Sequence, residues 1–353
     1  MKSNNKVLIA MSGGVDSSVA AFILKSKKYD LIGAMMKLYN GETESGCCSI
    51  SDAEDARLVA AKMGIPFYML NFTDSFADTV IKRFINAYQN GLTPNPCIDC
   101  NRFMKFKKFL NRATELECGQ IATGHYAIIE KDINGRFQLK KGLDHTKDQS
   151  YVLYSMSQSE LSRTLLPLGA LTKDNVREIA LEQGFVNAKK QDSQDICFAP
   201  GKNYANFIEN FTKTKLEKGN FINKSGQIIG EHKGIANYTI GQRKGLGLFN
   251  PTPLFVLELN SKKNTVTVGE SKDLFKKSLT ATDINLIPMD EITGSIKVEA
   301  KIRYAHTPAK ATVWQSKKDS LHIEFDEPQR AISPGQAVVL YNGDTVIGGG
   351  TII

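Results

Sequence analysis

The first residues in the chain that could do chemistry are Met11-Ser12-Gly13-Gly14-Val15-Asp16-Ser17-Ser18, directly after the apolar run 6–10. The apolar run predicts a buried strand, and the apolar spacing of residues 19–24 predicts one face of a helix. The glycines therefore lie in a strand-to-helix turn, where backbone N–H groups and a positive helix end suit a phosphate. No Gly-Lys-Ser/Thr follows at the spacing of the Walker loop, so the turn is of another kind.

The six cysteines, at positions 47, 48, 97, 100, 118 and 197, do not form the pattern of a disulfide scaffold in a chain of 353 residues. Cys97 and Cys100 lie between the breaker Pro94-Asn95-Pro96 and a helix predicted from residue 102 to 117. A thiol just before a helix N-terminus is expected to be a better nucleophile. Cys197 lies in a polar loop. These three thiols are therefore candidates for catalysis.

Other interpretations of the cysteines stay open. Cys97-x-x-Cys100 could ligate zinc or an iron–sulfur cluster, although no third and fourth cysteine follow at close spacing. Cys47-Cys48 could be a redox or sulfur-relay pair, or ordinary loop residues. Cys118 is expected to be structural.

The elements that position these residues alternate between strand and helix over the first 200 residues. Strands are predicted at 29–36, 65–72 and 120–129, and helices at 53–63, 76–89 and 172–183. Asp52 is the expected cap of the first of these helices, and Asp74 or Ser75 that of the second. This alternation predicts a parallel sheet with crossover helices, and ligands beyond the carboxyl ends of its strands.

From about residue 219 the chain consists of short alternating runs separated by turns, including a hairpin at 254–268. We expect one or two small β domains, the last of them barrel-like. The predicted domains are 1–205, catalytic; 206–278, small and central; and 279–353, a β-barrel.

The overall composition is that of a globular protein with a modest basic bias. Net charge is +8, which suits a polyanionic partner such as RNA but is also within ordinary compositional drift. No run approaches the ~20 apolar residues of a membrane span, and no signal-peptide core follows the start. We expect a cytoplasmic protein.

Ser12-Gly13-Gly14-Val15-Asp16-Ser17 resembles the PP-loop of ATP pyrophosphatases, which activate an oxygen as an adenylate. Along nearly its whole length, the chain resembles the tRNA-specific 2-thiouridylase family. The matching segments are 10–17, 46–49, 52–57, 71–72, 93–101, 122–127, 147–151, 166–169, 195–198, 238–247, 302–304, 333–336 and 348–350. The resemblance implies a Rossmann-like α/β sheet of the PP-loop type, followed by a small central domain and a C-terminal β-barrel-like domain.

The resemblance also implies a reaction. ATP, with Mg2+, adenylates the C2 oxygen of the wobble uridine in tRNA, such as those for Lys, Glu and Gln. Cys197 carries sulfur as a persulfide, and Cys100 is the catalytic nucleophile. AMP then leaves, 2-thiouridine forms, and a Cys100–Cys197 disulfide remains for reduction. The sulfur donor would be a protein, either a cysteine desulfurase or a sulfur-relay carrier.

The resemblance assigns binding roles position by position. The ATP contacts are Ala10, Met11, Ser12, Gly13, Gly14, Val15, Asp16, Ser17, Met36 and Gly124. The target-base contacts are Asn95, Pro96 and Cys97. The tRNA contacts are His125, Lys147, Asp148, Gln149, Arg303, Tyr304 and Gln336.

One position departs from the family pattern, because some members carry Asp where this chain has Cys97. An acid/base role in this loop is therefore in doubt. The alternatives are another PP-loop enzyme, such as an iron–sulfur tRNA thiolase, a lysidine synthase or a nitrogen-transferring ligase, or a nucleotide-regulated RNA-binding module. The basic helix face of Arg102, Lys105, Lys107 and Lys108 is either ordinary solvated surface or part of an RNA site.

Overall fold

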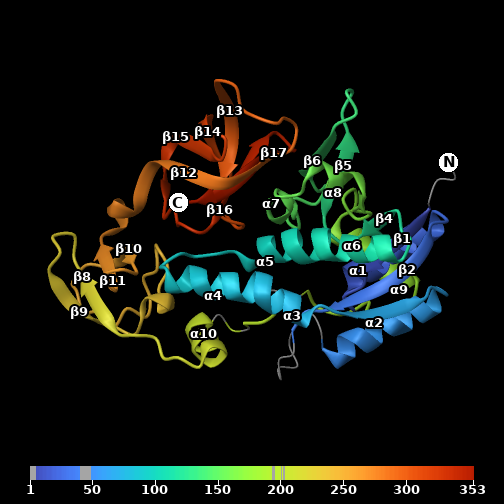
Figure 1. Ribbon diagram of the computed structural model, residues 1–353, viewed down its shortest axis with the longest axis horizontal. Helices are drawn as coiled ribbons and strands as arrows, with labels where there is room; N and C mark the ends of the chain where they lie inside the picture. Colours follow the sequence, from blue (N-terminus) through green and yellow to red (C-terminus); the bar gives the residue numbers. More distant parts are fainter. Residues whose placement is uncertain (1–4, 40–48, 193–194, 200, 202) are drawn as a thin grey trace. The chain divides into compact units, whose positions relative to one another are not determined.

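The computed structural model describes residues 5–39, 49–192, 195–199, 201 and 203–353. The chain divides into two compact units (Figure 1). Unit 1 comprises residues 1–80, 97–200 and 344–346, and unit 2 comprises 81–96, 201–343 and 347–353. The Cys47-Cys48 pair lies outside the described residues.

Unit 1 is built on a five-stranded sheet in the order β3-β2-β1-β4-β7. The strands are β1 (Lys6–Ala10), β2 (Asp30–Lys37), β3 (Phe67–Asn71), β4 (Gln120–Ala122) and β7 (Thr164–Leu165). All four pairings are parallel. Val7 and Ile9 of β1 are fully buried in an apolar cluster. The predicted parallel α/β sheet is therefore confirmed.

Three helices of unit 1 begin at side-chain or glycine caps. They are α1 (Val15–Ser26), α2 (Ile50–Lys62) and α9 (Lys173–Glu182), and α1 contacts both others. The cap of α2 is Ser49, whose hydroxyl accepts from the Asp52 N–H while Asp52 bonds back to Ser49. The prediction of Asp52 as the cap was wrong, because Asp52 is the third-position partner of a capping box.

Two longer helical runs contain π-helical turns. The first is α3 (Thr73–Phe76), η1 (Ala77–Ile81) and α4 (Lys82–Gln89), and the second is α5 (Pro96–Asp99), η2 (Cys100–Lys108) and α6 (Phe109–Glu115). The second begins six residues earlier than predicted, since Pro96 suits the first helical position, where a missing N–H costs nothing. The first begins at Thr73 with Phe72 as its N-cap, so the expected cap at Asp74 or Ser75 was wrong.

The single strand predicted at 120–129 is two strands. β4 ends at Ala122 in the parallel sheet, whereas β5 (Ala127–Lys131) pairs antiparallel with β6 (Phe137–Lys141). Residues 123–126, Thr-Gly-His-Tyr, redirect the chain between them, so the polar break between the two apolar runs marks a change of sheet and not one continuous strand. Short helices α7 (Ser150–Leu153) and α8 (Gln158–Ser162) follow.

The first part of unit 2 is a small β structure. Helix α10 (Tyr204–Thr212) precedes β8 (Gly219–Ile222), β9 (Ile228–His232), the 3₁₀ turn η4 (Ile235–Asn237), β10 (Phe255–Asn260) and β11 (Thr265–Gly269). The four strands form one sheet in the order β10-β11-β8-β9. β10 and β11 are antiparallel, which confirms the predicted hairpin. Its core includes Phe221, Val256 and Val266.

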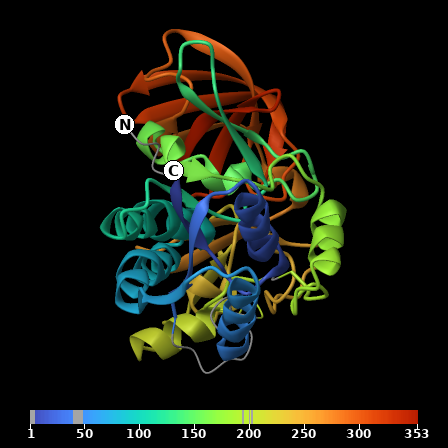
Figure 2. The ribbon, with the colours of Figure 1, turned by 90° about the vertical axis from the view of Figure 1, so that its right-hand side faces the viewer.

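The second part of unit 2 is a closed barrel. After the 3₁₀ turn η5 (Ser271–Leu274) come β12 (Phe275–Leu286), β13 (Ser295–Lys301), β14 (Ala309–Lys317), β15 (Ser320–Arg330), β16 (Ala337–Asn342) and β17 (Thr345–Ile352). They follow the order β12-β15-β14-β13-β16-β17, and an additional β12–β17 pairing closes the ring. The barrel strands, orange to red, curve around one interior in both views (Figures 1 and 2). Closure of these six strands confirms the barrel prediction.

Among the described residues, no helix is both long enough and apolar enough to cross a membrane.

Candidate functional site

The predicted ATP residues of unit 1 lie together at the carboxyl edge of the parallel sheet. Residues 11–14 connect the end of β1 to the start of α1. Met36 lies near the end of the neighbouring strand β2, and Gly124 follows the end of β4 on the other side of β1. The loops of three adjacent parallel strands therefore meet where such sheets bind ligands.

Two glycines make this meeting possible. Gly13 has a φ of +76°, and a Cβ there would lie 2.2 Å from the carbonyl oxygen of Asp52. A Cβ on Gly124 would lie 2.9 Å from the backbone nitrogen of Ser17. A side chain at either position would therefore displace the loop from the backbone that it contacts.

The start of α1 is open to an anion. Its N-cap is Gly14, which has no side chain to cap the first turn. Ser17 Oγ instead accepts from the Ser12 N–H at 3.1 Å and donates to the Gly14 carbonyl at 3.1 Å, so it holds the turn. The N–H groups of the first helical turn lack a side-chain acceptor and point out of the helix end, which is the arrangement that binds phosphate.

An ion network joins this loop to the segment that carries Cys197. Lys173 Nζ lies 2.7 Å from Asp16 Oδ1 and 2.7 Å from Asp192 Oδ1, and its side chain is only 8% exposed. Asp192 also pairs with Lys147 at 2.8 Å. The Tyr126 hydroxyl donates to Asp16 at 2.7 Å. One buried ammonium group thus bridges the PP-loop and the residue five positions before Cys197.

The network keeps the Asp192 carboxylate charged. Burial alone acts to raise the pKa of Asp192, but hydrogen bonds from Lys147 and Lys173 outweigh it and hold that pKa below its usual value. Burial raises the pKa of Tyr126, and the charge of Asp16 raises it further, so the phenol stays protonated and donates. The Asp192 carboxylate therefore stays negative, and the paired cations Lys147 and Lys173 balance its charge.

Sequence reasoning missed Lys173 and Asn187. Lys173 is the first residue of α9, where the helix dipole disfavours a cation, and that position was the signal available in the sequence. Asn187 donates to the Gly13 carbonyl at 2.9 Å and to Ser18 Oγ at 3.0 Å. Its buried Oδ1 has no hydrogen-bond partner among the described residues. Asn187 gave no sequence signal, because its role depends on contact with residues more than 160 positions away.

The structure also places the predicted catalytic thiols. Cys97, Cys100, Cys118 and Cys197 are all present as thiols; Cys97 is exposed, Cys100 and Cys197 are partly exposed and Cys118 is buried. The helix begins at Pro96, so Cys97 lies in its first turn and Cys100 begins the π-helical turn after it. The expectation that Cys100 precedes the helix was wrong, and the dipole argument applies to Cys97. Burial raises the pKa of Cys118, consistent with a structural thiol.

His125 is a neutral, buried side chain. Burial, reinforced by the charge of Lys105, puts its pKa well below the usual value. Thr123 Oγ1 lies 2.7 Å from Nδ1 and Lys105 Nζ lies 3.4 Å from Nε2. Because an ammonium group can only donate, Nε2 accepts and Nδ1 carries the proton. A histidine whose pKa is lowered in this way stays unprotonated but is a weak base.

The basic helix face is not a single surface. Lys105 contacts His125, Arg102 lies over the Phe103 ring at 5.4 Å, and Lys108 bonds to the Ser75 hydroxyl. Lys107 alone of the four is exposed. Three of the four cations therefore make contacts within the protein, and Lys107 faces solvent.

The side chains of unit 1 that are predicted to contact tRNA also make hydrogen bonds within the protein. Asp148 accepts from the N–H groups of Gly142 at 3.0 Å and Ser150 at 3.1 Å. Gln149 Oε1 accepts from the Tyr126 N–H at 3.0 Å. Together with the ion pair of Lys147, these bonds fix the loop beside the network.

In unit 2, Gln336 supports the segment that leads to Asn95 and Pro96. Its amide donates to the Thr93 carbonyl at 2.8 Å, and the Thr93 N–H donates to the Pro334 carbonyl at 2.8 Å. Asn95 is partly exposed and Pro96 is buried. Arg303 is partly exposed, and Tyr304, with 43% of its surface exposed, lies under Lys301 at the end of β13. Arg303 offers a cation to a ligand, and Tyr304 offers an aromatic ring.

No group of three or more His, Cys, Asp and Glu side chains in the described ranges is arranged to hold a metal ion. A magnesium ion that accompanies a nucleotide needs fewer protein ligands, because it keeps several waters and phosphate oxygens. Asp16, the second residue of α1, is the carboxylate beside the phosphate-binding turn, and its Oδ1 already accepts from Lys173 and Tyr126.

Three family models match the chain. They are described as a tRNA methyl transferase HUP domain over residues 5–201, a tRNA methyl transferase PRC-barrel domain over 205–270 and an aminomethyltransferase beta-barrel domain over 276–352. The first alone covers more than half of the chain.

Curated relatives match over the full length. The tRNA-specific 2-thiouridylase MnmA of Clostridioides difficile (strain 630) is 51% identical and covers 100% of this chain and 99% of its own. Proteins of the same name from Clostridium perfringens (strain ATCC 13124) and Clostridium botulinum (strain Alaska E43) are 49% and 50% identical over 99% of this chain, covering 99% and 98% of their own lengths. The chain belongs to the tRNA-specific 2-thiouridylase family.

Proposed function

We propose that this protein is an ATP-dependent tRNA sulfurtransferase that converts the wobble uridine of tRNA to 2-thiouridine. The observation that carries the proposal is the buried Lys173, which bonds to Asp16 of the nucleotide loop and to Asp192 of the Cys197 segment. One ion network connects the phosphate-binding turn to the segment of the thiol that would carry sulfur. This connection suits a reaction in which activation of the uridine oxygen is followed by sulfur transfer.

The first step replaces a poor leaving group with a good one. The C2 oxygen of uridine attacks the α-phosphorus of ATP, forming an O–P bond and releasing pyrophosphate. The N-terminus of α1 and the glycine turn hold the triphosphate, and Asp16 would hold Mg2+, which neutralises phosphate charge when bound. Asn95, Pro96 and Cys97 contact the base, which must leave its stack to reach the nucleotide.

The second step delivers sulfur. A donor persulfide passes its outer sulfur to the Cys197 thiolate, which leaves the donor as a thiolate and Cys197 as a persulfide. The terminal sulfur then attacks C2 and expels AMP. The Cys100 thiolate attacks the inner sulfur of Cys197, so the C2–sulfur bond is left as the thiocarbonyl and a Cys100–Cys197 disulfide forms. A dithiol reductant restores both thiols for the next turnover.

The tRNA contacts would come from both units. Lys147, Asp148, Gln149 and His125 shape the loop beside the ion network, and Arg303, Tyr304 and Gln336 contribute from unit 2. The positive charge of Arg303 and the exposed ring of Tyr304 suit an RNA backbone and an unstacked base.

The test is mass spectrometry of nucleosides from tRNA of cells that lack this protein. We expect 2-thiouridine derivatives to disappear from the wobble position and to return when the wild-type gene is restored. A parallel ATP–pyrophosphate exchange assay with purified protein and tRNA checks the adenylation step, and iron and zinc counts check the alternative of a cluster-dependent thiolase. Unchanged 2-thiouridine in the deletion strain, or bound iron whose removal abolishes activity, would contradict the proposal.

A further inference from the structure

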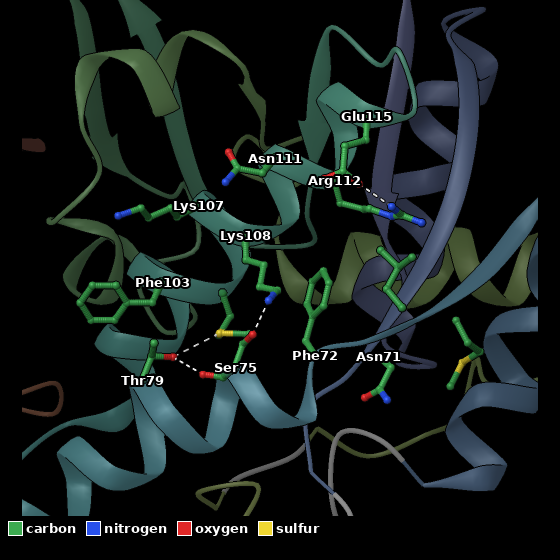
Figure 3. A pocket seen from close by; sticks show the side chains of 13 residues that line it. Asn71, Phe72, Ser75, Thr79, Phe103, Lys107, Lys108, Asn111, Arg112 and Glu115 are labelled. Atoms are coloured by element: carbon green, nitrogen blue, oxygen red, sulfur yellow. Dashed lines mark hydrogen bonds and ion pairs between the residues drawn. The ribbon is translucent and has the colours of Figure 1, made fainter.

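Unit 1 contains a pocket of about 680 Å³ whose lining residues have no part in the mechanism above. It is walled by the end of β3, by α3 and η1, and by η2 and α6 (Figure 3). Its lining combines aromatic rings with cations, including Phe72, Phe103, Lys107, Lys108 and Arg112.

The pocket continues onto an open strand. Among the described strands, β3 is the edge of the sheet and pairs only with β2. Tyr68 and Met69 on this strand are 50% and 49% exposed, although both are largely apolar. An exposed edge strand with apolar side chains is a template for an incoming strand, and a protein with no partner there would be expected to protect it.

The charge of the pocket selects an acidic occupant. Lys107, Lys108 and Arg112 line it against a single carboxylate, that of Glu115. Glu115 pairs with Arg112, and Lys108 bonds to Ser75 and lies 5.4 Å over the Phe72 ring. Lys107 is exposed, and in Figure 3 its side chain points away from Lys108 and Phe72 at the rim of the pocket. The lining therefore keeps a net positive charge after its internal pairs are formed.

Two wall elements of the pocket are connected to the segments of Cys100 and Cys197. Cys100 is the first residue of η2, the helix that also supplies Phe103 and Lys107. On the opposite wall, Phe76 follows the pocket residue Ser75 and packs edge-on against Phe198, with ring centroids 5.7 Å apart. Phe198 is the neighbour of Cys197. Thr79 and Met104 join the two walls, with Oγ1 and Sδ 3.5 Å apart.

We propose that this pocket and the β3 edge dock an acidic, extended segment of the protein that hands persulfide sulfur to Cys197. This inference rests on the proposed function. An open strand edge offers main-chain hydrogen bonds to a polypeptide, and the exposed Tyr68 and Met69 side chains favour a protein over an RNA backbone. Because η2 also carries Cys100, and Phe76 of α3 contacts Phe198 beside Cys197, a donor docked here would rest on elements that support both thiols.

The test compares two ways of loading Cys197 with labelled sulfur. One uses a cysteine desulfurase of the same organism that carries a ³⁵S-persulfide, and the other uses a small alkyl ³⁵S-persulfide, which performs the same exchange without docking. The variants are Lys107→Glu, which reverses the exposed charge, and Met69→Lys, which blocks the strand edge. Lys189→Glu, at an exposed lysine elsewhere in unit 1, is the matched control.

We expect both variants to load roughly tenfold more slowly from the protein donor, at unchanged rate from the alkyl persulfide, and with unchanged tRNA affinity. Equal loading from the protein donor by variant and control overturns the proposal. A fall in tRNA affinity for Lys107→Glu overturns it in favour of RNA, and slower loading from both sources shows that the pocket acts on Cys197 itself. If the wild type loads from neither source, the proposed function fails first.

Discussion

The nucleotide end of unit 1 and the barrel of unit 2 bury opposite kinds of side chain. Around the PP-loop, the buried positions include charged and polar groups such as Lys173, Asn187 and Thr123. The barrel interior is apolar, with Val313, Phe325 and Val338 fully buried. Its candidate ligand contacts, Arg303 and Tyr304, lie on the outside. Breaking the hydrogen bonds of a buried polar group costs a large free energy, so such groups hold a fixed geometry. Substitution of a surface group changes binding with little effect on folding stability.

This difference predicts that chemistry resides in unit 1 and that unit 2 contributes affinity. The largest expected effect is that of Cys100→Ser or Cys197→Ser. Either change should abolish 2-thiouridine formation because sulfur transfer needs both thiols, while ATP–pyrophosphate exchange with tRNA continues. Cys118→Ser, which removes the buried thiol of the same unit, is the control and should retain activity. Full thiolation by the Cys197→Ser protein would end the proposed mechanism.

Lys173→Met should have the next largest effect. It leaves Asp16 and Asp192 without their shared cation, so we expect adenylation to fall on the order of 100-fold from misplacement of the loop. The loss of a buried partner should also lower the free energy of unfolding by about 3 kcal/mol. Pyrophosphate exchange and guanidinium unfolding measure the two effects, with the exposed Lys189→Met as control. Wild-type exchange in Lys173→Met would show that the network is not part of the site.

Arg303→Ala should change affinity and not chemistry. We expect about tenfold weaker tRNA binding at low salt and a salt dependence of binding reduced by about one unit of slope, with kcat unchanged at saturating tRNA. Fluorescence anisotropy over a salt series checks this prediction. Lys310→Ala, an exposed cation of the same barrel, is the control. Equal losses of tRNA affinity in the two variants would mean that the net charge of the barrel, and not the position of Arg303, determines binding.

The smallest expected effect is a pH dependence from His125. Its pKa is lowered in the folded protein, so below about pH 6.5 the unfolded chain binds a proton that the folded protein does not. Folded stability therefore falls as pH decreases, by at most about 1.4 kcal/mol per pH unit. We expect the free energies of unfolding of the wild type and of His125→Gln, measured at pH 7, 6 and 5, to differ in their pH dependence by this slope. Parallel curves would contradict the buried neutral assignment.

Local patterns account for what the sequence predicted well. The apolar run 6–10 and the glycines after it predicted β1, the turn and α1, because each depends on neighbours within a few residues. The hairpin near 254–268 was found for the same reason. Errors arose where a local signal had two solutions. Asp52 could be the N-cap of the helix or the third-position partner of the N-cap residue, and residues 120–129 could form one strand or two.

The sequence by itself determined the family, through the number and order of the matching segments. It also determined the order of α/β and β regions and the phosphate-binding turn, because these depend on residues that are near one another in the chain. Only the tertiary structure decided that Lys173 meets Asp16, 157 positions away, and that Asn187 supports Gly13. It also decided that His125 is buried and neutral and that a basic pocket lies on the helix begun by Cys100. Burial and long-range pairing set these properties, and neither is encoded in the spacing of neighbouring residues.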